Sequence, residues 1–117
     1  MITIWGRTNS LNVQKVLWLL EELSLSYERI DAGLTYGVND TAAFKAMNPN
    51  GLVPVLKEDE FILWESHAIL RYLASRHGRN TLWPEDERIR AISDQWLDWC
   101  STTVWPNMRP VFQNLVR

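Results

Sequence analysis

In the first part of the chain, two short apolar runs flank a segment in which apolar residues recur at helical spacing. The β-branched and aromatic run Ile2–Trp5 predicts a strand, and Tyr27–Ile30 predicts a second one. Between them, apolar residues recur at i, i+3, i+4 and i+7, namely at Val13, Val16, Leu17 and Leu20. This spacing predicts a helix over roughly Leu11–Leu23, with Ser10 at its N-cap. The order strand, helix, strand predicts a βαβ unit with parallel strands.

The next segment predicts a short helix followed by a hairpin. The helix is expected over Thr41–Met47, with Asn39 or Asp40 as its cap, and the turn sequence Asn-Pro-Asn-Gly ends it. Two apolar runs, Val53–Leu56 and Phe61–Trp64, flank four charged residues. That spacing predicts an antiparallel hairpin with a proline near the start of its first strand, where a missing N–H is tolerated.

A third helix is expected next, with Ser66 as its cap and Gly78 at its end. Residues 1–79 therefore have the pattern of an α/β domain with the element order βαβαββα. Residues 80–87 have the composition of a linker, and 88–117 form the start of a second, helical unit.

The second unit is expected to be a long helix that Pro106 ends or kinks. Six residues, four of them large and apolar, recur along one side of this helix, and we expect them on its inner face: Ile89, Ile92, Trp96, Trp99, Cys100 and Thr103. So short a unit cannot bury a core alone. It must dock on the first unit, on a partner or on further sequence, and among these we expect Trp96 and Trp99 to be buried against another chain.

Composition narrows the class of protein. The chain has 117 residues, 46% of them hydrophobic, and a net charge of −2, which gives no cationic surface for nucleic acid. No apolar run approaches the ~20 residues of a membrane helix. The single cysteine, Cys100, excludes an internal disulfide and indicates a cytoplasmic setting. His67 and His77 lack metal-ligand spacing, so we expect them at the surface and expect no metal.

Two segments resemble the glutathione transferase family: NPNGLVPVL at 48–56 and LWESHAILRYL at 63–73, followed by DQWLDW at 94–99. The resemblance implies a thioredoxin-like α/β domain followed by the start of an all-α C-terminal domain, of which 88–117 would be only a truncated part. It is closest to bacterial members whose activating residue is a hydroxyl or an amide. It also implies a cytoplasmic homodimer.

The resemblance implies that glutathione is the co-substrate and that a donor at the start of the first helix stabilises its thiolate. Four polar residues cluster there: Thr8, Asn9, Ser10 and Asn12. We rank Ser10 first and Asn12 second as the catalytic residue. The same residues also suit a plain N-cap and polar first turn, and the sequence does not separate the four.

The remaining site residues follow from the same resemblance. Val53 is expected to pair its main chain with the cysteinyl unit of glutathione, beside a cis peptide at Pro54. Glu65 and Ser66 are expected to hold the γ-glutamyl group, where the start of a helix favours a carboxylate. Asn39 is expected to contact the glycyl end.

The function implied is thiolate attack on a small electrophile, by conjugation or dehalogenation, with a role in detoxification. One alternative is a glutathione-dependent disulfide reductase, although no cysteine precedes Cys100. The other is a transferase-like binding module without catalysis. Val53, Pro54, Glu65 and Ser66 favour a working tripeptide site over such a module.

Overall fold

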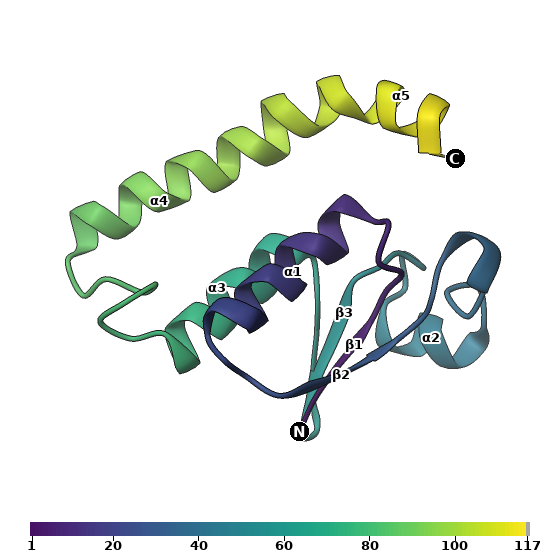
Figure 1. The fold of residues 1–117 in the computed structure, drawn as a ribbon, viewed down its shortest axis with the longest axis horizontal. Coiled ribbons are helices and arrows are strands. Elements are labelled where there is room, and N and C mark those ends of the chain that lie inside the picture. Colours follow the sequence, from purple (N-terminus) through teal and green to yellow (C-terminus); the bar gives the residue numbers. More distant parts are fainter. Residues whose placement is uncertain (117) are drawn as a thin grey trace. The chain divides into compact units, whose positions relative to one another are not determined.

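The computed structural model describes residues 1–116, which divide into a compact unit over 1–78 and a second unit from Arg79 onward. The first unit contains a four-stranded sheet in the order β2-β1-β3-β4 (Figure 1). Its strands are β1 (Ile2–Trp5), β2 (Tyr27–Ile30), β3 (Val55–Glu58) and β4 (Phe61–Trp64). β1 and β2 are parallel, whereas β3 is antiparallel to both of its neighbours. This is the expected thioredoxin-like arrangement.

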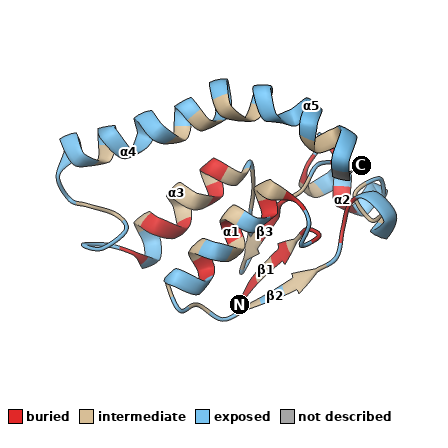
Figure 2. Cartoon of the chain, turned by 45° about the horizontal axis from the view of Figure 1, so that its top comes forward, coloured by how far each residue is buried: buried red, intermediate tan, exposed pale blue. Residues whose placement is uncertain are grey.

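Three helices belong to the first unit: α1 (Leu11–Glu22), α2 (Ala42–Met47) and α3 (Ser66–His77). α1 and α3 pack together over one face of the sheet (Figures 1 and 2). The buried residues of that layer come from the strands and from both helices: Ile2, Ile4, Val16, Leu20, Leu56, Ile69 and Leu73. The predicted apolar stripe of the first helix thus forms part of the main core.

The opposite face of the sheet has a smaller core built around α2. Phe44 of α2 is buried against Ala32 and Val55, with Trp5 and Trp64 packed beside them. Successive residues of a strand point to opposite faces. Val55 and its cross-strand partners Trp5 and Trp64 therefore belong to this core, whereas Leu56, the next residue of β3, belongs to the other. α2 therefore fixes the loop that leads into β3.

Two sequence predictions in this unit were wrong in detail. The strand expected over Val53–Leu56 begins at Val55 and continues to Glu58, because Pro54 has no N–H for the ladder while the backbone of Lys57 and Glu58 pairs with β1. The cap of α2 is Thr41, whose Oγ1 accepts from the Phe44 N–H at 3.2 Å, rather than Asn39 or Asp40.

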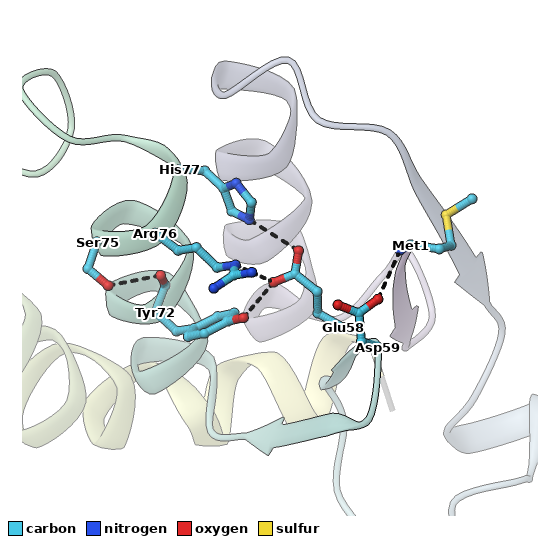
Figure 3. Close-up of polar contacts among 7 residues, drawn as sticks. All are labelled: Met1, Glu58, Asp59, Tyr72, Ser75, Arg76 and His77. Atoms are coloured by element: carbon cyan, nitrogen blue, oxygen red, sulfur yellow. Dashed lines mark hydrogen bonds and ion pairs between the residues drawn. The ribbon is translucent and has the colours of Figure 1, made fainter.

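A cluster around Glu58 ties the C-terminal half of α3 to the end of β3 (Figure 3). The Tyr72 hydroxyl donates to Glu58 Oε1, Arg76 Nε lies 3.3 Å from the same oxygen, and His77 Nε2 lies 3.2 Å from Oε2. Burial and the neighbouring Glu58 carboxylate raise the pKa of Tyr72 to about 12. Glu58 thus anchors three side chains of one helix to the sheet.

Pro106 does not end the helix of the second unit, so that alternative is wrong; instead the helical geometry changes just before this proline. The unit comprises α4 (Glu87–Trp99), a π-helical segment (Cys100–Val104) and α5 (Trp105–Val116). The Trp105 N–H donates to the Cys100 carbonyl, five residues back. Pro106 cannot donate to the carbonyl four residues before it, and a wider turn just before it relieves the clash with its ring.

The face of α4 expected to point inward is exposed in the structure. Within the described part of the chain, α4 has no buried residue (Figure 2). Its large apolar side chains are about half exposed: Ile89, Ile92, Trp96 and Trp99. Among residues 1–116, no helix has the length and apolar character to cross a membrane.

Candidate functional site

The sheet brings the predicted site residues to one edge, meaning the end of the sheet where β1 and β4 finish and β3 begins. β1 ends at Trp5, which lies opposite Val55, the first residue of β3, and Val55 in turn lies opposite Trp64, the last residue of β4. The segment that leads into α1, the segment that precedes β3 and the segment that opens α3 therefore meet at this edge. Residues from three separate parts of the sequence are brought within reach of one ligand.

The start of α1 presents Ser10 and Asn12. Ser10 is the N-cap, as predicted: its backbone is extended and its Oγ accepts from the Val13 N–H at 3.4 Å. Accepting this bond leaves the hydroxyl proton of Ser10 available to donate elsewhere. Ser10 is buried and Asn12 is half-buried, whereas Thr8 and Asn9 are exposed.

The segment before β3 contains the predicted cis peptide between Val53 and Pro54. Pro54 is buried and Val53 is half-buried beside the Phe44 core. Because the ladder begins at Val55, the N–H and C=O of Val53 lie outside the sheet pairing. These two groups are the main-chain donor and acceptor that the sequence analysis assigned to a peptide ligand.

The junction between β4 and α3 differs from the prediction in one respect. Ser66 is the first residue of α3, and the N-cap position is occupied by Glu65, whose side chain makes no capping bond. Glu65 has φ 75° and ψ 117°, a left-handed conformation that costs a non-glycine residue about 1–3 kcal/mol. The exposed Glu65 carboxylate, the Ser66 hydroxyl and the first amides of α3 are consequently presented together at the edge.

Lys15 and His67 were not assigned to the site by sequence. His67, expected at the surface, is only 9% exposed, because the first turn of α3 packs against α1. Lys15 Nζ lies 3.0 Å from His67 Nε2 and 3.5 Å from Ser66 Oγ. Their sequence separation of 52 residues leaves no local signal by which this contact could have been found.

The loop that carries Asn39 is fixed to the segment before β3. Asn39 Nδ2 donates to the Gly51 carbonyl at 3.0 Å. Lys45 of α2 lies beside the same glycine, since its Cε is 3.6 Å from the position of a β-carbon there. Asn39 therefore supports the loop that leads to Val53, and its second amide N–H remains a possible donor for a ligand.

Asn48 is a further residue whose role was missed. It is 2% exposed, its Nδ2 donates to the Leu52 carbonyl at 2.9 Å, and its Oδ1 accepts from the Asn50 N–H at 3.0 Å. The sequence indicated only turn chemistry here. In the structure this side chain holds the turn together and fixes the approach to Val53.

Among residues 1–116, no group of three or more His, Cys, Asp or Glu side chains could hold a metal ion. The chemistry offered at the edge is that of hydroxyl and amide donors, a carboxylate, a lysine ammonium and main-chain groups. Together they suit a peptide-like ligand that carries both an ammonium and a carboxylate. The four-stranded sheet with its helices therefore places residues 1–78 in the class of thioredoxin-like domains.

Comparison with known proteins identifies the family. Residues 1–75 match the family described as "Glutathione S-transferase, N-terminal domain". Over its whole length the chain is 53% identical to the glutathione S-transferase GstB of Escherichia coli, of which it covers 57%. It is 37% identical to glutathione S-transferase 1 of Manduca sexta, with 93% of this chain and 51% of that protein covered. The chain therefore belongs to the glutathione S-transferase family.

Similar solved structures also belong to the glutathione S-transferase family. The theta class glutathione S-transferase from Xanthomonas axonopodis pv. citri, crystallised with glutathione bound, superposes with a TM-score of 0.95 and 46% identity over 99% of this chain and 56% of that one. Glutathione transferase E6 from Drosophila melanogaster gives a TM-score of 0.89 and 30% identity over 99% of this chain and 54% of that one. The chain spans about half the length of the relatives it matches.

Proposed function

We propose that the protein is a glutathione transferase that binds glutathione at the edge where β1, β3 and β4 meet and activates its thiol for attack on a small electrophile. The observation that carries this proposal is the convergence of Ser10, Val53 and the Glu65–Ser66 junction on one edge of the sheet. The glutathione bound to the Xanthomonas relative supports the same ligand.

The γ-glutamyl end of glutathione carries an ammonium and a carboxylate. Glu65 is exposed and can accept hydrogen bonds from the ammonium. The Ser66 hydroxyl and the first amides of α3 can donate to the carboxylate, and the helix dipole favours an anion at that position. The strained backbone of Glu65 supports this assignment, because such conformations gather at functional sites.

The cysteinyl unit would pair with the main chain of Val53, which lies outside the sheet ladder. Ser10, at the N-terminus of α1, would then donate its hydroxyl proton to the thiolate. A free thiol has a pKa near 8.5, so a donor and a helix dipole that lower it by about two units would leave most of it ionised at neutral pH. Asn12 is the second candidate for this role.

Asn39 would contact the glycyl carboxylate through the amide N–H not used on Gly51. The electrophile would be a small molecule attacked by the thiolate, either in conjugation or with loss of a halide, in a detoxifying role. We further propose a cytoplasmic homodimer, in keeping with the single cysteine and the exposed apolar face of α4.

The test is calorimetric titration of the 117-residue chain with glutathione, together with retention on immobilised glutathione. We expect saturable one-site binding that Glu65→Ala weakens, since the ammonium loses its acceptor. Glu60→Ala, in the turn between β3 and β4 at the opposite end of these strands, is a matched loss of one exposed carboxylate and should leave binding unchanged. A wild-type chain that neither binds nor is retained would overturn the proposal.

A further inference from the structure

We propose that Lys15 is a positioning residue for the γ-glutamyl carboxylate of glutathione: it orients the Ser66 hydroxyl and adds a positive charge at the start of α3. This inference rests on the proposed function, because it assigns a role within the same site. It starts from the two contacts that the Lys15 ammonium makes across the α1–α3 interface.

The direction of the Ser66 hydroxyl follows from donor chemistry. A lysine ammonium has three N–H donors and no acceptor. At 3.5 Å, Lys15 Nζ therefore donates to Ser66 Oγ, and this oxygen must direct its own proton elsewhere. Ser66 is the first residue of α3, where the helical amides also face outward. The hydroxyl is thereby prepared to donate to an anion rather than to accept from one.

His67 holds the lysine in this place. Its Nε2 lies 3.0 Å from Lys15 Nζ and must accept, so the imidazole is neutral and carries its proton on Nδ1. The His67 side chain is only 9% exposed, and this burial restricts the ring to few orientations. The long and flexible lysine is thus bound at its tip by two residues of one helical turn.

The charge of Lys15 complements that of the helix. The N-terminus of an α-helix acts as roughly half a positive charge, and Lys15 adds a full one within hydrogen-bond distance of the first residue. Glu65, the residue before Ser66, is exposed and negative. A ligand group with a carboxylate and a neighbouring ammonium therefore meets both a cation and an anion at the start of α3, and this pairing of unlike charges favours one orientation of the ligand.

The experiment compares two ligands: glutathione and 4-aminobutanoyl-cysteinylglycine, which keeps the amine and lacks the neighbouring carboxylate. Affinities are measured by calorimetry for the wild type, for Lys15→Met and for Lys15→Gln. Lys57→Met, on β3, is the matched loss of a lysine charge away from the edge. We expect Lys15→Met to weaken glutathione binding about tenfold, because the γ-glutamyl carboxylate loses a nearby positive charge and the orientation of the Ser66 donor, with little change for the analogue.

Lys15→Gln keeps a donor without the charge, so an intermediate loss is expected, and it serves as the second variant should Lys15→Met not fold. If the Lys15 variants bind glutathione as tightly as the wild type, or lose both ligands equally, the positioning role is wrong while the proposed function stands. If the wild type binds neither ligand, the proposed function itself is wrong.

Discussion

The Tyr72 hydroxyl donates a hydrogen bond to Glu58 and so joins the middle of α3 to the last residue of β3 (Figure 3). This contact lies at the opposite end of the sheet from the candidate site, since Glu58 pairs with Ile2 at the start of β1. α3 is consequently held at both ends, by Glu58 near its C-terminus and by Lys15 at its first turn. The position of Ser66 depends on both attachments.

Tyr72→Phe should destabilise the protein in a pH-dependent manner. Below pH 10 the variant should lose about 1–2 kcal/mol, since the hydrogen bond to Glu58 is gone. The unfolded phenol has a pKa of 10.0, whereas in the folded protein the pKa of Tyr72 is about 12. Between these values the folded state binds more protons, so the wild type loses its advantage as pH rises. Urea unfolding of both proteins at about pH 9 and about pH 11 tests this. A difference in the free energy of unfolding between the two proteins that is the same at both pH values would contradict the prediction.

Ser10→Ala should raise the pKa of the thiol of bound glutathione by about one unit or more, since the thiolate loses its donor. The variant also loses its N-cap and about 0.5–2 kcal/mol of stability. The thiolate absorbance of bound glutathione, followed against pH, gives the pKa directly. Ser10→Thr keeps both functions of the hydroxyl and is the control. If Asn12→Ala shifts the pKa and Ser10→Ala does not, Asn12 is the activating residue.

Ser66→Ala should weaken glutathione binding by about 1–3 kcal/mol, the cost of one hydrogen bond to a charged group. Calorimetry measures the change. Ser75→Ala is the matched control, because Ser75 lies on the same helix and its hydroxyl donates to the Tyr72 carbonyl at 3.0 Å. Equal affinities for Ser66→Ala and the wild type would reject the role of this hydroxyl.

Gly33→Ala should destabilise the protein more than Gly37→Ala. Both glycines have positive φ, 96° and 64°, so an alanine is strained at either position. Only at Gly33 would the added β-carbon meet another group, Arg7 Nη1 at 2.5 Å. Arg7 is 4% exposed and therefore has little room to move. Urea midpoints of the two variants measure the difference, and equal values would show that Arg7 adapts without cost.

The correct predictions came from two sources, local sequence signals and the family resemblance. Ser10 before an apolar helical stripe predicted an N-cap, and its bond to the Val13 N–H confirms it. The cis bond at Pro54 was predicted from the family resemblance, because only about 5–6% of X–Pro bonds in folded proteins are cis. The strand that follows was misplaced by two residues, since an apolar run does not show which backbone groups join the ladder.

Contacts between distant elements could not be predicted in this way. The burial of His67 and its contact with Lys15 depend on how α1 packs against α3, which neither helix encodes alone. Glu58 is one of the four charged residues between the two apolar runs, where the sequence indicates no partner, but Tyr72 and Arg76 reach it from the next helix. The burial and the contacts of polar residues at the ends of helices and strands cannot be predicted locally, because their partners come from elsewhere in the chain.

The apolar face of α4 leads to the last prediction. Trp96 and Trp99 are 57% and 49% exposed, and their rings meet edge to face at 5.5 Å. Ile89 and Ile92 on the same helix are also more than half exposed. Contiguous apolar patches of this kind are rare on monomeric proteins and mark interaction surfaces.

We therefore expect the 117-residue chain to bury Trp96 and Trp99 against a second copy, in a dimer or a rearranged assembly. Light scattering should give a mass above that of the monomer, and Trp96→Arg should lower it, because a buried charge without a partner is costly. Trp18→Arg is the control, since Trp18 is 71% exposed and belongs to α1 of the other unit. Acrylamide quenching of the wild type and of Trp96→Phe isolates the contribution of Trp96. A monomeric mass by light scattering, with Trp96 readily quenched by acrylamide, would contradict the prediction.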